Sequence, residues 1–348
     1  MKLCKGAVLA LAVSYGLIYC HTNKSKFMLE QKGDSLTLIH ITNPTNYILL
    51  PIEEEAEESW VRLDIGDVAD TDMDIRLAQT KVDYWVPFVL PADAKTVTVR
   101  VQKSLGDALC WKEMKLSDTF DPSHTDKFRP VYHHAPLYGW MNNANGLVYE
   151  DEEYHLYYQY NPYGSKWGNM HWGHSISKDL MHWEHLAPAI VRDTLGHIFS
   201  GSSIVDQENV AGYGTGTILA FYTSASDKNG QIQCLAYSND NGRTFTKYDK
   251  NPILRSSDRR KDFRDPKVFW YAPGNKWIMI VAADKEMCFY DSEDLKDWNY
   301  MSSFGEGYGV QPCQFECPDM VELPVDGDTE HKKWALICLL YTSDAADE

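Results

Sequence analysis

A short pattern recurs three times in the second half of the sequence and constrains the fold more than any other feature. It consists of a Ser, an Asp two residues further on, and then an aromatic residue, in the segments S-K-D-L-M-H-W, S-N-D-N-G-R-T-F and S-E-D-L-K-D-W. These segments begin at Ser177, Ser238 and Ser292, so the period is about 55–60 residues. Recurrence at such a spacing indicates repeated structural units that pack against one another.

Each repeat also carries four strand-like runs, with a polar turn before the last run. Four antiparallel strands per unit are typical of a β-propeller blade, whereas an open sheet or a sandwich would not need the recurrence. A fourth unit begins near Phe315. The predicted strands are residues 146–150, 154–160, 170–175 and 183–186; then 199–205, 218–222, 233–237 and 245–248; then 267–271, 277–282, 287–290 and 298–301.

The segment before the repeats has a different organisation. Residues 26–121 alternate short β-type runs with turn residues and contain no long helical period, which predicts a small N-terminal β-sandwich. Residues 121–136, rich in His, Pro and Asp, are interpreted as a linker. The β-type runs of the sandwich are residues 35–41, 47–50, 60–63, 84–90 and 96–101.

The charge balance excludes one class of partner. Fifty Asp and Glu against 33 Lys and Arg give a formal net charge of −17. Because no basic stripe offsets the repulsion from phosphate groups, we expect no nucleic-acid partner.

The N-terminus is typical of an export signal over residues 1–20. Lys2 and Lys5 precede an apolar run, residues 6–18, that is too short to span a bilayer comfortably. The sequence L-I-Y-C ending at Cys20 suggests lipoprotein processing, with residues 21–26 as a tether; simple secretion is the alternative. We therefore expect a periplasmic or cell-surface lipoprotein or a secreted protein, attached to a membrane only through a lipidated Cys20.

The last eleven residues, C-L-L-Y-T-S-D-A-A-D-E at 338–348, look like the translation of a sequencing adapter. We expect the natural sequence to depart from this one near Ile337 and to be longer. The five cysteines outside the signal and this tail are odd in number and scattered, which indicates neither a disulfide framework nor a zinc site. They are Cys110, Cys234, Cys288, Cys313 and Cys317.

Polar groups in an aromatic setting stand at the start of the first strand of each unit: W-M-N-N-A-N-G from Trp140, F-S-G-S from Phe199, F-R-D-P from Phe263 and F-E-C-P-D from Phe315. Equivalent positions in successive blades should converge on one mouth of a central channel. The two carboxylates there, Asp265 and Glu316, suggest glycoside hydrolysis. We expect the neighbouring Arg264 to keep Asp265 ionised.

The order and wording of these motifs resemble glycoside hydrolase family 32, whose members carry W-M-N-D-P-N-G, F-S-G-S, R-D-P and E-C-P-D. The resemblance covers residues 140–319, and the N-terminal module resembles that of some gut-bacterial members. It implies an incomplete five-bladed propeller over residues 131–337. It also implies retaining hydrolysis of β-fructofuranosyl bonds in a fructose-containing oligo- or polysaccharide, with no metal or organic cofactor.

The resemblance also implies residue roles. Glu316 would be the general acid/base, Asp265 the transition-state stabiliser, and Asn143 occupies the position of the nucleophile. The implied substrate-binding residues are Trp140, Asn142, Gln159, Trp167, Phe199, Ser200 and Arg264.

The chain departs from the family at that nucleophile, because Asn143-Ala144 replaces Asp-Pro. A carboxamide lacks the negative charge and the nucleophilicity that the covalent step requires, so a loss of roughly 10³-fold or more is expected. Three interpretations remain open: a sequencing error, a weakened or altered hydrolase, and a protein that binds fructan without cutting it.

Two histidine-rich segments, beginning at His171 and His182, contain the residue types of a zinc site but not the H-E-x-x-H spacing. We therefore do not predict metal binding there. The pair His133-His134 falls in the linker and could lie near the pocket.

Overall fold

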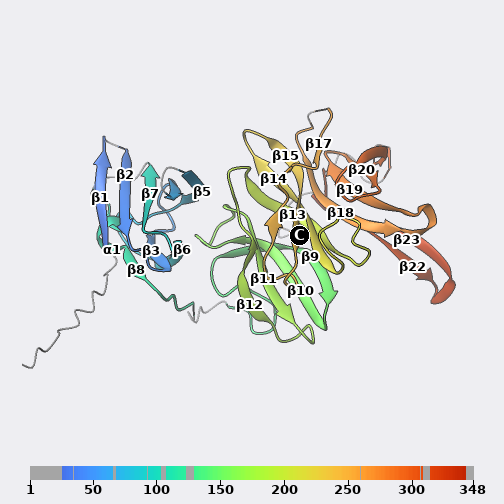
Figure 1. Ribbon diagram of the computed structural model, residues 1–348, viewed down its shortest axis with the longest axis horizontal. Coiled ribbons are helices and arrows are strands. Elements are labelled where there is room, and N and C mark those ends of the chain that lie inside the picture. The colour runs from blue at the N-terminus through green and yellow to red at the C-terminus, as the bar shows by residue number, and fades with distance from the viewer. Residues whose placement is uncertain are drawn as a thin grey trace, which may run out of the picture.

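The computed structural model describes residues 26–33, 35–65, 68–91, 93–102, 107–122, 129–258, 260–305, 307–308 and 314–341. The expectations for residues 1–25, including the signal and Cys20, lie outside this range. Figure 1 shows a smaller N-terminal module, blue to cyan, beside a larger body that runs from green to red. No helix of the described residues is long and apolar enough to cross a membrane.

The N-terminal module is the predicted sandwich of two antiparallel sheets. The five-stranded sheet has the order β1-β2-β7-β4-β5 and the three-stranded sheet the order β6-β3-β8. The sequence did not predict β1, β5 or β8. Of these, β5 is an edge strand rich in Asp, a residue that is depleted from strands in general. The strands are β1 (Lys26–Lys32), β2 (Leu36–Thr42), β3 (Tyr47–Ile52), β4 (Ser59–Ile65), β5 (Val68–Ile75), β6 (Tyr84–Val89), β7 (Thr96–Gln102) and β8 (Lys115–Ser117), with one short helix, α1 (Cys110–Glu113).

Between the two sheets lies one apolar core, formed by alternate residues of each strand, such as Val97, Val99 and Val101 of β7. One member of this core comes from outside the module. Tyr163, a residue of the larger body, is only 8% exposed and packs among the module's side chains.

The larger body consists of antiparallel sheets arranged as propeller blades. Three sheets have the orders β12-β11-β10-β9, β13-β14-β15-β16 and β18-β19-β20-β21, and a two-stranded sheet pairs β22 with β23. The short β17 also pairs with β15. Their bounds are β9 (Trp140–Glu150), β10 (Glu153–Asn161), β11 (His171–Ser177), β12 (Glu184–Ile190), β13 (His197–Asp206), β14 (Thr217–Ser226), β15 (Gly230–Ser238), β16 (Thr246–Lys247), β17 (Leu254–Arg255), β18 (Phe263–Tyr271), β19 (Lys276–Ala283), β20 (Glu286–Ser292), β21 (Asn299–Phe304), β22 (Gln314–Val325) and β23 (Asp328–Tyr341).

The recurring Ser and Asp form the turn between the third and fourth strands of each blade. At the end of β11, Ser177 Oγ accepts the backbone N–H of Leu180 at 2.8 Å, and Asp179 Oδ1 accepts that of His182 at 2.8 Å. Ser292 makes the same 2.8 Å bond to Leu295 at the end of β20. Because side-chain oxygens satisfy N–H groups that no strand can reach, the turn requires the same residue types in every blade.

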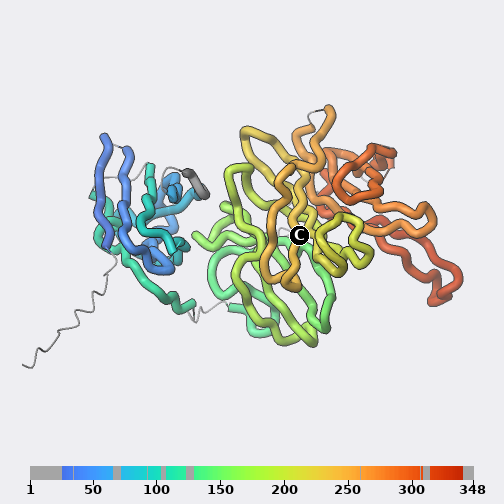
Figure 2. Tube along the Cα trace, viewed as in Figure 1, coloured from blue at the N-terminus to red at the C-terminus, as the bar shows by residue number. Residues whose placement is uncertain are grey.

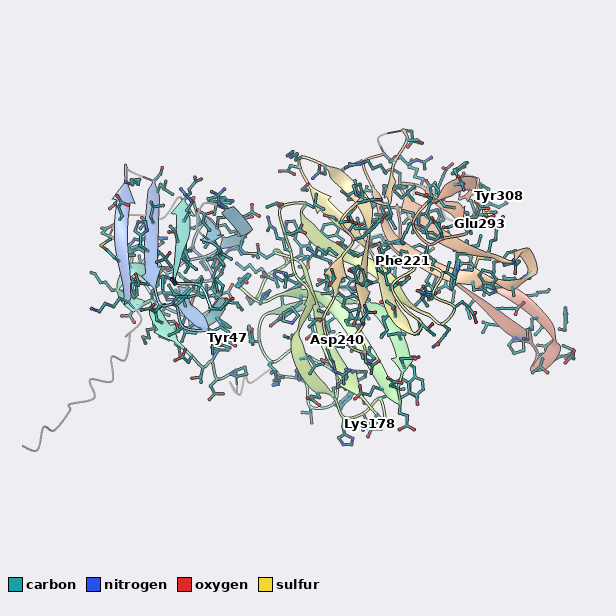
Figure 3. The ribbon with its side chains drawn as sticks, in the orientation of Figure 1. Tyr47, Lys178, Phe221, Asp240, Glu293 and Tyr308 are labelled. Carbon is teal, nitrogen blue, oxygen red and sulfur yellow. The ribbon has the colours of Figure 1, made fainter. Side chains whose placement is uncertain are left out.

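Apolar cores lie between successive blades. Strand β14 is buried on both faces: Ala220 and Tyr222 pack toward the first blade, whereas Leu219 and Phe221 pack toward the third. Figure 3 labels Phe221 in the interior of the larger body, where it is fully buried. Alternation of side chains across a strand explains why this apolar run serves two cores.

The first strands of the blades, β9, β13, β18 and β22, are neighbours in that order. The first three begin earlier than predicted: β9 starts at Trp140 instead of residue 146, so the sequence motifs lie within the strands. Pro and Asn are depleted from strands in general, so motifs that contain them do not mark the start of a strand in the sequence. The all-β fold is confirmed, with a sandwich followed by an incomplete propeller whose described residues contribute to four of the five expected blades.

Candidate active site

The four inner strands share one irregularity. In each, two consecutive residues lie opposite a single residue of the neighbouring strand, which is the geometry of a β-bulge. The bulged residues are 142–143 in β9, 199–200 in β13, 265–266 in β18 and 317–318 in β22. Bulges redirect side chains and are frequent beside active sites, and here they coincide with the four sequence motifs.

A polar pocket of about 400 Å³ opens among these strands. Of the residues that the sequence assigned to a site, all but Trp140 line it. The predicted lining residues are Asn142, Asn143, Gln159, Trp167, Phe199, Ser200, Arg264, Asp265 and Glu316. Trp140 contacts the lining residue Asn142 instead: its indole N–H donates to Asn142 Oδ1 at 2.9 Å.

Arg264 forms the charged centre of the pocket. Its Nη2 donates to Glu316 Oε1 at 2.6 Å, and its Nη1 donates to Asp262 Oδ1 at 2.5 Å. Burial disfavours the guanidinium charge, but the bond to Glu316 and the nearby Asp265 carboxylate raise the pKa of Arg264 above its usual value. Arg264 therefore stays charged and fixes the orientation of Glu316.

Asp265 is buried at 6% exposure and has a backbone φ of 63°, which is uncommon for a non-glycine residue. Its Oδ2 accepts the backbone N–H of Cys317 at 2.9 Å and lies 3.8 Å from Arg264 Nε. Burial raises the pKa of Asp265, while these two contacts lower it by less. Arg264 therefore favours the ionised form of Asp265, as expected of a neighbouring cation, but desolvation is the larger effect and the net pKa shift of Asp265 is upward.

Asn143 is held by neighbours on both sides. Its Nδ2 donates to the sulfur of Cys317 at 3.3 Å, and its Oδ1 accepts from Asn142 Nδ2 at 3.5 Å. Burial, and then the charge of Asp265, raise the pKa of the Cys317 thiol to about 12, so this thiol is not a nucleophile at neutral pH. The side chain at position 143 of the pocket is thus a neutral amide held by Asn142 and Cys317.

An aromatic wall closes one side of the pocket. The Trp167 ring, 52% exposed, stacks on His197 with centroids 5.9 Å apart and meets Phe199 edge-on at 5.8 Å. Its free face is available to an apolar sugar face. Gln159 is fixed at the floor, where its Nε2 donates to the backbone oxygen of Ile198 at 2.8 Å.

Two lining residues, Gln231 and Asp262, were not predicted. Asp262 stands two residues before Arg264, so an acidic residue beside the R-D-P motif was the available signal. Gln231 comes from the third strand of its blade, β15, and no motif marks it; its Oε1 accepts the backbone N–H of Phe263 at 2.8 Å.

The histidines set aside above lie outside this pocket. Burial lowers the pKa of His171 and of His174 to about 3. His134 contacts Ser175 Oγ at 2.9 Å and does not line the pocket, and His133 is exposed beside Tyr132. Within the described part of the chain, no group of three His, Cys, Asp or Glu side chains could hold a metal ion.

Comparisons with known proteins agree with this geometry. Residues 133–347 match the family described as "Glycosyl hydrolases family 32 N-terminal domain", and residues 33–132 match a "Domain of unknown function (DUF4980)". The chain is 51% identical over 225 residues to a levanase of Bacillus subtilis, covering 63% of this chain and 33% of that protein. It is 42% identical over 221 residues to invertase 2 of Saccharomyces cerevisiae, covering 60% and 41%.

Two solved structures show the same architecture. Exo-inulinase from Aspergillus awamori has a TM-score of 0.57 at 36% identity, covering 62% of this chain and 47% of that one. Fructofuranosidase from Schwanniomyces occidentalis complexed with fructose has a TM-score of 0.55 at 40% identity, covering 60% and 42%. The chain thus spans from a third to less than half of the length of these relatives.

A propeller that brings an arginine, three acidic residues and two aromatic rings into one pocket is of the glycoside hydrolase type. The matched family covers more than half of the sequence, and the chain belongs to glycosyl hydrolase family 32.

Proposed function

We propose that the pocket binds a β-fructofuranosyl unit and that the protein is a retaining hydrolase of fructans or sucrose, slowed at its first step by Asn143. The observation that carries this proposal is the convergence of Asp265, Arg264 and Glu316 with the aromatic wall in one pocket. Levanase, invertase and fructofuranosidase among the relatives support the sugar class.

In the proposed reaction Glu316 protonates the oxygen of the leaving group and later takes a proton from water. The 2.6 Å bond from Arg264 holds its carboxyl group in place. Asp265 accepts sugar hydroxyls and stabilises the positive charge that develops at the anomeric carbon. Asn142, Gln159, Trp167, Phe199 and Ser200 complete the fructosyl site, and Trp140 supports it through Asn142.

The attacking group is the weak part of this site. A retaining mechanism needs a carboxylate that bonds to the anomeric carbon. Asn143 instead carries a neutral amide, whose N–H donates a hydrogen bond to the sulfur of Cys317. This contact favours a second candidate function: a protein that holds fructan without releasing sugar. Both functions use the same recognition groups, so they differ only in turnover.

The decisive experiment compares the full natural chain carrying Asn143 with its Asn143→Asp variant. Binding of sucrose, levan and inulin is measured by calorimetry, and released reducing sugar is measured in parallel. We expect both forms to bind, and the Asp form to hydrolyse roughly 10³-fold faster. Equal rates of hydrolysis by the two forms would contradict a disabled nucleophile. Binding without sugar release by the Asn form would identify a fructan-binding protein. If neither form bound these sugars, the proposed sugar class would be rejected.

We also propose export. The signal-like residues 1–20 and the extracellular exo-inulinases among the relatives support a periplasmic or cell-surface lipoprotein, anchored by Cys20, or a secreted protein. The acidic charge supports the absence of a nucleic-acid partner. The bounds of the two domains, 26–121 for the sandwich and 131–337 for the propeller, remain predictions. The adapter origin of residues 338–348 also remains a prediction, and residues 338–341 form the end of strand β23.

A further inference from the structure

The loop between β10 and β11 touches the pocket on one side and the N-terminal module on the other. Trp167 of this loop lines the pocket. Tyr163, Lys166 and Asn169, from the same short segment, all contact the module. Figure 2 shows this green loop extending from the larger body toward the module.

The first contact is apolar. Tyr163 enters the core of the sandwich, where its ring lies 5.5 Å from that of Phe88. On its other side it meets His171, at the start of β11, with ring centroids 5.9 Å apart. A propeller residue that completes the core of another module fixes its own backbone to that module.

The second contact is a reciprocal pair of hydrogen bonds. Asn169 Nδ2 donates to the backbone oxygen of Asp74 at 2.7 Å, and the backbone N–H of Asp74 donates to Asn169 Oδ1 at 2.9 Å. Asn169 is 3% exposed and has a φ of 42°. Edge strand β5 therefore pairs with a side-chain amide of the loop in place of another strand.

Charged side chains reinforce both ends of the loop. Lys166 Nζ donates to the backbone oxygen of Glu54 at 3.0 Å. Arg192 Nη1 donates to Asn169 Oδ1 at 3.0 Å, and its Nη2 lies 3.7 Å from the carboxylate of Asp72. The module thus contacts the loop on both sides of Trp167: at Tyr163, four residues before it, and at Asn169, two residues after it.

We propose that the N-terminal module, which matches a "Domain of unknown function (DUF4980)" over residues 33–132, serves to position Trp167 at the rim of the sugar pocket. The inference rests on the proposed function, because it assigns to Trp167 a contact with the bound sugar. Tyr163 and Asn169 are positioning residues: they touch no sugar and act through the loop. The module is then a structural part of the binding site and not an independent attachment.

The test is a double-mutant cycle with Tyr163→Ala and Trp167→Ala in the full natural chain carrying Asn143, which permits binding measurements with little turnover. Calorimetry with sucrose and 1-kestose gives the dissociation constants. We expect each single variant to bind about three- to tenfold more weakly, and the double variant to bind like Trp167→Ala alone. Independent, multiplying losses would overturn the inference.

A second measurement does not depend on sugar. Hydrogen exchange of residues 162–169 should become at least about tenfold faster in Tyr163→Ala, and also in Asn169→Asp, which replaces the donor to Asp74 by an acceptor. The matched control is Ile39→Ala, which creates a cavity in the same core. Ile39 belongs to β2, and Figure 1 shows this strand on the side of the module away from the propeller. It should leave loop exchange and sugar binding unchanged.

Failure of the positioning role and failure of the proposed sugar-binding function give different results. Unchanged loop exchange in both Tyr163→Ala and Asn169→Asp, or equal loosening by Ile39→Ala, overturns the positioning role whatever the ligand. If the parent protein binds neither sugar, the proposed function fails, and the exchange measurement alone decides whether the module holds the loop.

Discussion

The side-chain amide of Asn143 donates a hydrogen bond to the sulfur of Cys317, 3.3 Å away, between residues 174 positions apart in the chain. An aspartate at the same place could only accept from this thiol. Compared with an aspartate, an asparagine here therefore reverses the direction of this hydrogen bond and carries no charge. Around it, Arg264 Nε lies 3.8 Å from Asp265 Oδ2 and Arg264 Nη2 lies 2.6 Å from Glu316 Oε1.

If only the attacking group is missing, an external nucleophile should replace it. The substrate for this test is a β-fructofuranoside with an activated leaving group, such as p-nitrophenolate. Asn143→Ala opens space beside its anomeric carbon, so azide can attack that carbon while the bond to the leaving group breaks. We expect azide to accelerate nitrophenolate release by at least about tenfold in Asn143→Ala and little in the parent. Release that is indifferent to azide in both proteins would show that more than the nucleophile is impaired.

The guanidinium group of Arg264 donates hydrogen bonds to Asp262 and to Glu316 from two different nitrogens. Lysine keeps the charge but offers a single nitrogen, so Arg264→Lys leaves one of two partly buried carboxylates, Asp262 or Glu316, without its donor. We expect sucrose or 1-kestose binding to weaken more than about tenfold while unfolding stability changes little. Calorimetry and urea unfolding measure the two effects, and a lysine variant that binds like the parent would show that charge alone suffices.

Gly201 in the F-S-G-S motif has no room for a side chain, because a Cβ there would overlap the backbone oxygen of Phe221. Backbone at this position cannot retreat without breaking the pairing of β13 with β14. We expect Gly201→Ala to lower the free energy of unfolding by about 2–4 kcal/mol. Gly216→Ala is the control: its φ of +77° is unfavourable for alanine, but nothing lies within 4 Å, so about 1 kcal/mol should be lost. Equal losses in urea unfolding would refute the steric explanation.

Glu53 caps the turn that follows β5 in the module. Its Oε2 accepts the backbone N–H groups of Gln79 and Thr80, each at 2.8 Å, and these bonds lower the pKa of Glu53 from 4.5 to about 2. A lowered carboxyl pKa stabilises the folded state above pH 4.5, and this contribution is lost as the pH falls from about 4.5 toward 2. Glu53→Gln should cost about 1–3 kcal/mol at pH 7, and the difference from the parent should shrink toward pH 2. Urea unfolding at several pH values measures this, and a difference that is independent of pH would contradict it.

Local pattern was sufficient for much of the fold. The Ser-x-Asp turns depend on hydrogen bonds within four residues, so they are visible in the sequence as a repeat. Alternating apolar residues, as in β7, mark a strand wherever it packs. By contrast β1, β5 and β8 were not predicted, and β5 is held in place by pairing with β4 and by the Asn169 amide, which are contacts with residues outside the strand.

The site divides in the same way. Its principal side chains stand in motifs at corresponding positions of successive blades, so the sequence determined that Asn143, Asp265 and Glu316 would meet. It did not determine the upward pKa shift of Asp265, the part of Gln231 in the pocket, or the contact of Asn143 with Cys317. It also gave no sign that Tyr163 completes the core of another module. Those properties depend on burial and on approaches between residues far apart in the chain, which local pattern does not encode and only the packed tertiary structure decides.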